Sequence, residues 1–187
     1  SSDLGNMTYS YRMFTVALSF LVLLVASTVK AAPQLEPIGT FKMDLYESAA
    51  IDNQAITGKF GGGTVTFTTG GSATIESCVE DGYIKSSGVI DFNLRCFAKL
   101  DDGVAMLIRY TGLIKTGDGF WDSFLAGNVV GPGRLMEFWC NEIKMVTTSE
   151  KYAWVNETMF IGEGKNLSVP TADGPGIVHY ELYALRH

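Results

Sequence analysis

A series of short strand-like segments, separated by glycine-rich turns, constrains the fold of this chain more than any other feature of its sequence. The segments are rich in Val, Ile, Thr, Phe and Tyr, and several alternate apolar with polar residues, the pattern of a half-buried β-strand. In chain order they are residues 35–46, 55–60, 63–68, 72–79, 83–100 (one strand, or two with a break near Ser86-Ser87-Gly88), 104–114, 134–146 and 177–185. Residues 120–130 are ambiguous, and only residues 149–155 are expected to form a short helical turn. The sequence therefore predicts an all-β fold with at most one or two short helical turns.

Glycine supplies turn signals between these segments. Gly61-Gly62-Gly63 predicts a bulge or a tight turn, because the Lys-Ser/Thr pair of a phosphate-binding loop does not follow it. Asp81-Gly82 and Asp101-Asp102-Gly103 predict hairpin turns. Many antiparallel strands without helices form either a sandwich or a barrel. Because closure leaves no unpaired edge in a chain that is 47% hydrophobic, we expect a single antiparallel β-barrel.

An apolar run near the N-terminus predicts a signal peptide. Arg12 precedes the run MFTVALSFLVLLV, residues 13–25, and small residues then lead to an expected cleavage site after Ala31. The alternative is a transmembrane anchor, but the run is shorter than the ~20 residues that span a bilayer. We expect residues 1–6 to be upstream or added sequence, residues 7–31 to be the leader and residues 32–187 to form one extracellular domain.

Cysteines and sequons fit a secretory route. Cys78, Cys96 and Cys140 allow one disulfide and one free thiol in an oxidising compartment, with three possible pairings, or they are all buried thiols. Asn156-Glu157-Thr158 and Asn166-Leu167-Ser168 are possible glycosylation sites. Asn166 is the better expected acceptor, because its Gly, Lys and Asn neighbours indicate an exposed loop.

Charge and motif content exclude several classes of partner. The net charge is −6 and the mature part has no run of Lys or Arg, so nucleic acid is not an expected partner. We expect no metal and no cofactor, because there is no CxxC pair, His/Cys cluster, Walker loop, HExxH motif or nucleophile elbow. The expected partner is a small molecule, without a stable membrane anchor once the leader is removed; a homo-oligomer is also compatible with the sequence.

The predicted strand over residues 89–98 has two distinct faces. The apolar face carries Ile90, Phe92, Leu94, Cys96 and Ala98. The other face carries Val89, Asp91, Asn93, Arg95 and Phe97. This more polar face either points to solvent, which is the ordinary case, or lines the interior of the barrel.

Three parts of the sequence share a recognisable pattern. Residues 87–113 have a central Arg and an Asp-Asp-Gly turn, residues 151–162 read KYAWVNETMFIG, and residues 180–183 belong to the terminal strand. In this order the chain resembles the family catalogued as domain of unknown function 3237, over about residues 35–185. The resemblance implies a compact antiparallel barrel, similar in shape to the calycins and lipocalins, and no settled reaction. It also favours a pocket that contains the residues at its motif positions, Arg95, Tyr152, Trp154 and Asn156.

The candidate site follows from the resemblance and from the polar strand faces. The candidate ligand-binding residues are Asp91, Asn93, Arg95, Arg109, Tyr152, Trp154 and Asn156. If the protein is an enzyme, Arg95 and Tyr152 are the candidate catalytic residues, since they donate hydrogen bonds to developing negative charge. A glycan on Asn156 would exclude this residue from the pocket. The carboxylates that could act as acid or base, or lie on the surface, are Glu76, Glu80, Asp91, Glu137, Glu142 and Glu181.

Three functions fit these features. The first is a secreted barrel that binds a small, largely apolar or aromatic molecule in its interior. The second is a cofactor-independent enzyme of secondary metabolism, a cyclase, isomerase, lyase or pericyclase, which uses the same pocket. The third is a secreted interaction protein without a pocket.

Overall fold

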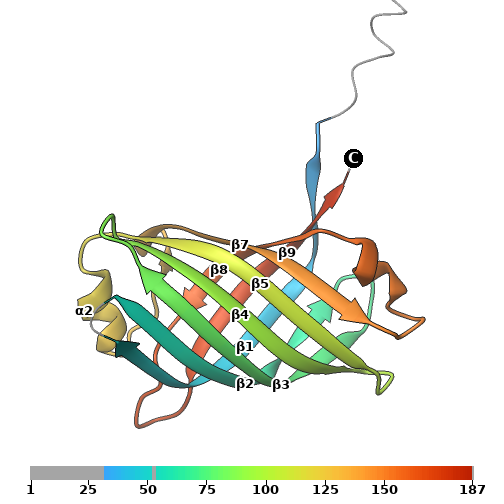
Figure 1. The fold of residues 1–187 in the computed structure, drawn as a ribbon, viewed down its shortest axis with the longest axis horizontal. Coiled ribbons are helices and arrows are strands. Elements are labelled where there is room, and N and C mark those ends of the chain that lie inside the picture. Colours follow the sequence, from blue (N-terminus) through green and yellow to red (C-terminus); the bar gives the residue numbers. More distant parts are fainter. Residues whose placement is uncertain (1–31, 52–53, 187) are drawn as a thin grey trace, which may run out of the picture. The chain divides into compact units, whose positions relative to one another are not determined.

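Long antiparallel strands wrap into a closed barrel over the part of the chain that the structure describes (Figure 1). The computed structural model describes residues 32–51 and 54–186, so the expected leader lies outside the described residues. The barrel strands are β1 (Gln34–Ile51), β2 (Ala55–Phe67), β3 (Ser72–Ile84), β4 (Val89–Leu100), β5 (Ala105–Thr116), β7 (Leu135–Thr147), β8 (Phe160–Leu167) and β9 (Gly176–Arg186). The shorter elements are helix α2 (Phe120–Leu125), strand β6 (Gly131–Pro132) and the 3-10 turn η1 (Ala153–Glu157).

The strands follow one another around the barrel in chain order. Each barrel strand pairs antiparallel with the next, β5 pairs directly with β7, and β9 returns to pair with β1. The two-residue strand β6 pairs in parallel with the start of β7. Because the sheet closes on itself, its backbone groups find partners within the barrel and no long edge is left open. The predicted all-β barrel with short helical turns is confirmed.

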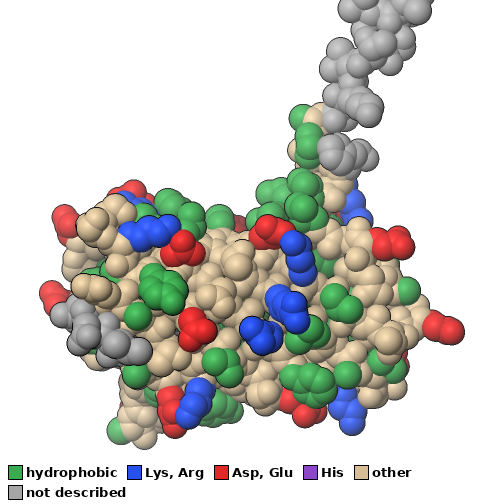
Figure 2. All heavy atoms as spheres, viewed as in Figure 1, with side chains coloured by type: hydrophobic (Ala, Val, Ile, Leu, Met, Phe, Trp, Pro, Cys, Tyr) green, Lys and Arg blue, Asp and Glu red, His purple; other side chains and the backbone are tan. Residues whose placement is uncertain are grey.

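Alternation along each strand separates the core from the surface. On β4, Ile90, Phe92 and Leu94 point into the barrel and are buried, whereas the intervening residues face outward. Large apolar side chains from the other strands fill the interior with them, and Phe41, Ile108 and Phe160 have no exposed surface. Figure 2 shows charged side chains of both signs on the outer face. No helix within residues 32–51 and 54–186 has the length and apolarity needed to cross a membrane.

Bulges or irregularities interrupt the alternation at several places, and two of them matter for the interior. Between β1 and β2 the register shifts between Lys42 and Asp44, opposite Gly62 and Gly63, both of which have positive φ. The glycine run therefore forms a bulge inside a continuous strand. Between β3 and β4 the register shifts between Ile75 and Ser77. Because side chains on a strand alternate with a period of two, this second bulge changes which residues of β3 point inward.

The hairpin turn predicted at Asp81-Gly82 is wrong, since both residues lie inside β3. The turn lies between Ile84 and Val89, at the expected break near Ser86-Ser87-Gly88, and it divides residues 83–100 between β3 and β4. Steric crowding explains the glycine at position 82: the residue is buried in the barrel wall, and a Cβ there would lie 2.7 Å from Cγ1 of Ile56. Here glycine makes room for a neighbouring side chain.

Candidate functional site

A pocket opens into the barrel at the end that carries α2. Its volume is about 160 Å³, and its wall is formed by residues from β1, β2, β3, β4, β5, β7, β8 and β9 together with α2. The aromatic residues of the wall are Phe60, Phe92, Phe120, Trp121, Phe124, Trp139 and Tyr180. Within α2, the rings of Phe120 and Phe124 are stacked with centroids 5.4 Å apart. The helix therefore presents an aromatic surface to the pocket.

Glu80 is the carboxylic acid in the wall of this pocket. Its position depends on the bulge of β3: Ala73 and Ile75 point inward before the bulge, and Cys78 and Glu80 point inward after it. Opposite Glu80 lie Gly58 on β2 and Leu94 on β4. The hydroxyl of Thr57 donates to the main-chain carbonyl of Glu80 at 2.9 Å, a bond that does not involve the carboxyl group.

The surroundings of Glu80 favour its neutral form. Burial in the apolar wall raises the pKa of Glu80 from 4.5 to about 8, and the neighbouring charge of Asp81 adds to the rise. Within the described residues, no cation pairs with this carboxyl. A carboxyl with such a pKa is partly protonated and partly ionised around neutral pH, as acid–base catalysis requires.

Two tyrosines and a tryptophan form a polar cluster beside Glu80. The hydroxyl of Tyr180 donates to the hydroxyl of Tyr110 at 3.2 Å. Burial raises the pKa of both tyrosines well above 10, and the charge of Glu80 contributes to each rise. The ring of Trp139 packs edge-on against Tyr180 with centroids 4.6 Å apart.

Some buried polar atoms near this cluster have no hydrogen-bond partner among the described residues. They are Nε1 of Trp139 and both amide atoms of Asn141. Trp139 and Asn141 both point inward from β7, where Gly164 and Gly162 leave room for them. Because unpaired buried polar groups are rare and costly, they indicate a place where a ligand or an internal water accepts and donates hydrogen bonds.

Four of the predicted ligand-binding residues lie outside the barrel. Asn93, Arg95 and Arg109 are exposed on the outer face of β4 and β5, and Asp91 is half-buried there, paired with Lys85 at 2.8 Å. Of the two alternatives for the more polar face, the structure has the ordinary one, in which it points to solvent, because the apolar face of the hairpin fills the barrel. Arg95 lies directly opposite Arg109, and Arg109 opposite Lys144, in a shallow outer groove.

Tyr152 and Trp154 lie at the other end of the barrel. Tyr152 is buried and donates to Asp101 at 2.8 Å, and Lys151 contacts the same carboxylate at 2.8 Å. Trp154 packs edge-on against Phe67, with centroids 5.2 Å apart. These contacts cover that end of the barrel. Tyr152 and Trp154 therefore do not share a pocket with Arg95, which lies on the outer face.

Asn156 and Asn166 are both held by hydrogen bonds. The side chain of Asn156 accepts from the main-chain N–H of Thr147 and donates to its carbonyl, so it does not line the pocket. Asn166 is half-buried in β8 and accepts from Arg134 at 2.6 Å. The expected exposed loop at Asn166 is therefore wrong, because its neighbours form a strand.

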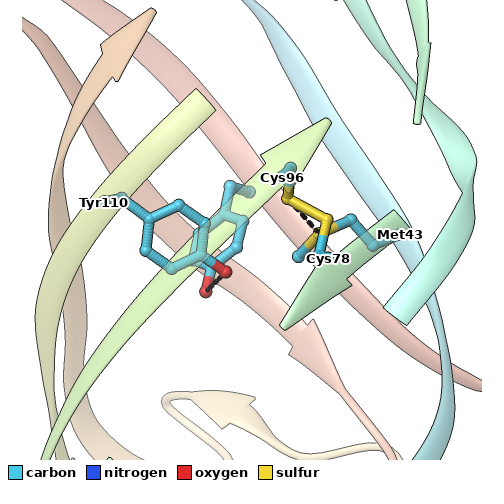
Figure 3. The surroundings of a disulfide bond; sticks show 5 residues. Met43, Cys78, Cys96 and Tyr110 are labelled. Atoms are coloured by element: carbon cyan, nitrogen blue, oxygen red, sulfur yellow. Dashed lines mark hydrogen bonds between the residues drawn. A yellow bond between two sulfur atoms is a disulfide. The ribbon is translucent and has the colours of Figure 1, made fainter. Parts of the chain in front are cut away.

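A disulfide joins β3 to β4 inside the barrel (Figure 3). It links Cys78 to Cys96, which are directly opposite in the strand register, while Cys140 is a free, exposed cysteine. The sulfur of Met43 lies 3.5 Å from that of Cys78, and Figure 3 shows Tyr110 in the same part of the interior. The three possible pairings thus reduce to one.

In the sequence, Glu80 is only one of six candidate carboxylates. The others show how ordinary surface carboxylates behave here: Glu142 pairs with Lys144, and Glu76 is exposed. The useful signal was the position of Glu80 two residues after Cys78, on the same face of the strand. It predicts an inward-pointing Glu80 only once Cys78 is known to point into the barrel.

These features define an up-and-down β-barrel with an apolar pocket at one end and a carboxyl group in the pocket wall. The chain belongs to the family described as "Protein of unknown function (DUF3237)", whose model matches residues 33–185. The resemblance found in the sequence is thereby confirmed. No curated protein matches the chain closely enough to serve as a relative.

Several solved structures share the fold at low sequence identity. A conserved protein of unknown function from Rhodopseudomonas palustris superposes with a TM-score of 0.69 at 12% identity, covering 84% of this chain and 100% of that one. A β-barrel-like protein from Acinetobacter baumannii has a TM-score of 0.65 at 21% identity, with coverage of 85% and 99%. A protein from Penicillium herquei described as an enzyme has a TM-score of 0.54 at 14% identity, with coverage of 85% and 98%.

Proposed function

We propose that this protein binds a small, largely apolar or aromatic molecule in the pocket beside α2. The observation that carries the proposal is the pocket itself, with an aromatic wall and one carboxyl group. Ligand sites in proteins are mostly apolar with a few convergent polar groups. An apolar cavity of about 150 Å³ is large enough for benzene, so a volume of about 160 Å³ suits a compound of one or two rings.

Binding of simple aromatic probes tests this proposal. Indole, phenol and naphthalene are titrated by calorimetry and by the fluorescence of Trp121 and Trp139, which both line the pocket. We expect saturable binding that Ile56→Phe weakens at least tenfold, because Ile56 lines the pocket and the larger side chain occupies it. The matched control is Val79→Phe on the outer face, where Val79 is exposed. If no probe binds, or if both variants bind equally well, the proposal is wrong.

A second candidate function is a cofactor-independent enzyme such as a cyclase, isomerase, lyase or pericyclase. Two observations favour it: a similar structure, that of Penicillium herquei, is described as an enzyme, and the pocket holds Glu80. The third function, an interaction protein without a pocket, has less support because a pocket is present.

We also propose that the protein is secreted. The support is the predicted leader and the Cys78–Cys96 disulfide, since disulfides persist mainly in oxidising compartments. Expression of the whole chain in eukaryotic cells should release a protein whose N-terminus is Ala32. Retention of the product in cells with an intact N-terminus would contradict this.

A further inference from the structure

We propose that Glu80 is a catalytic proton-transfer residue, which takes a proton from one atom of an aromatic or carbonyl compound in the pocket and returns it to another. This inference rests on the proposed function, because the compound must first occupy the pocket beside α2. It goes further, because it assigns a reaction class and a catalytic residue to a site that binding alone does not require.

The placement of Glu80 supports a chemical role. A strand that continued without the bulge of β3 would point position 80 outward, as it does Glu76. The bulge instead puts a carboxyl group into a wall of aromatic and aliphatic side chains. Burying a carboxyl without a charged partner is unfavourable for stability. Unfavourable placements of this kind are typical of functional sites.

The groups around Glu80 leave its proton available. Tyr180 from β9 and Tyr110 from β5 are the titratable groups that interact with it across the interior, and Asp81 adjoins it on β3. On the neighbouring strands β2 and β4, the opposite residues Gly58 and Leu94 carry no charge. Surface carboxylates such as Asp91 have a lysine partner instead. Glu80 is therefore not committed to an ion pair in the described part of the chain.

The reaction is balanced without any co-reactant. The Glu80 carboxylate accepts a proton from a C–H bond of the bound compound, and the electron pair of that bond moves into the compound and places negative charge on its oxygen. The buried N–H of Trp139 lies in the wall of the same pocket, beside the hydroxyl of Tyr180, and is the donor for that oxygen. The protonated Glu80 then returns its proton to a different atom, so the net change is an isomerisation.

The elimination of 5-nitrobenzisoxazole is a direct probe of such a base. Glu80 would take the proton from C3, the electron pair of the C–H bond would form the nitrile, and the N–O bond would break to give 2-cyano-4-nitrophenolate, whose colour reports the rate. The probe is planar, aromatic and largely apolar, as the pocket requires. We expect Glu80→Gln to lower kcat at least ~100-fold, the usual contribution of a general base, while the dissociation constant of the probe changes less than threefold.

The matched control is Glu76→Gln, on the same strand but exposed on the outer face, which should retain the rate. In the unmodified protein the rate should rise with pH and level off above about 8, the pKa of Glu80; this measurement needs no variant to fold. If the probe binds but Glu80→Gln retains the rate, or the pH profile is flat, the assignment of Glu80 is overturned while binding stands. If the probe and the simple aromatics all fail to bind, both proposals are wrong.

Discussion

Glu80 illustrates how the setting of one residue changes its chemistry. Burial in the pocket wall, with the nearby charge of Asp81, raises the pKa of its carboxyl from 4.5 to about 8. Glu163 shows the opposite shift: the hydrogen bond from Lys165 is the main cause that lowers its pKa. Desolvation and pairing act in opposite directions on a carboxyl group.

The first prediction concerns stability and pH. Folded Glu80 holds a proton that the unfolded chain releases, since the pKa is about 8 in the folded state and 4.5 in the reference. The contribution of Glu80 to the free energy of unfolding is therefore fully present below pH 4.5. It falls as the pH rises from 4.5 to about 8, by roughly 1.4 kcal/mol per pH unit at most. Urea unfolding should show that the free energy of unfolding falls more between pH 5.5 and pH 8 in the unmodified protein than in Glu80→Gln. Equal losses in the two proteins would contradict the shifted pKa.

The second prediction separates the outer groove from the pocket. Arg95 and Arg109 lie opposite each other on the outer face, and like charges in this position destabilise a sheet. Arg95→Thr should leave thermal stability unchanged or raise it, within about 0.5 kcal/mol, and should not alter the affinity for aromatic probes. A large loss of affinity in Arg95→Thr would contradict this prediction and show that Arg95 takes part in binding.

At the scale of elements, β3 determines what the barrel interior contains. Its bulge turns Cys78 and Glu80 inward together, so the disulfide and the pocket carboxyl depend on the same irregularity. Helix α2 then forms part of the pocket wall, with Phe120 buried and Leu125 exposed. Strand and helix together turn an end of the barrel into a site.

The third prediction tests the link between β3 and β4. The Cys78–Cys96 disulfide spans 18 residues of sequence, and closing a loop of this size restricts the unfolded chain by about 3 kcal/mol. The double variant Cys78→Ala/Cys96→Ala should lower the free energy of unfolding in urea by about this amount. Cys140→Ser, at the free cysteine, serves as the control and should change little.

At the scale of the whole barrel, the two ends have different structures. At one end, Tyr152 and Trp154 cover the interior, and the carboxylate of Asp101 accepts hydrogen bonds from Tyr152 and Lys151. At the other end, α2 borders the pocket. The same strands run from one end to the other, and the pairing of β1 with β9 and of β5 with β7 closes them into one sheet. The closed end therefore supports the barrel, and the end beside α2 is available for binding.

The fourth prediction compares a tryptophan at each end. Trp154→Ala removes contacts with Phe67 and Phe160, and it should lower stability by about 3 kcal/mol without changing probe affinity. Trp121→Ala removes part of the pocket wall and should weaken probe binding with a smaller loss of stability. Calorimetric unfolding and titration of both variants measure this contrast. The same effect on affinity at both ends would contradict it.

The sequence by itself determined the class of the fold and most of its strands. Alternation and turn residues depend on local chemistry, so the strand pattern over residues 83–100 and 104–114 and the turn at Asp101-Asp102-Gly103 were readable in advance. Only the tertiary structure decided which face of each strand is inside and which distant residues meet. A single bulge reverses the inward set, and closure brings Glu80, Trp139 and Tyr180 together from three strands. No local pattern encodes these contacts, so the pocket became visible only in the folded barrel.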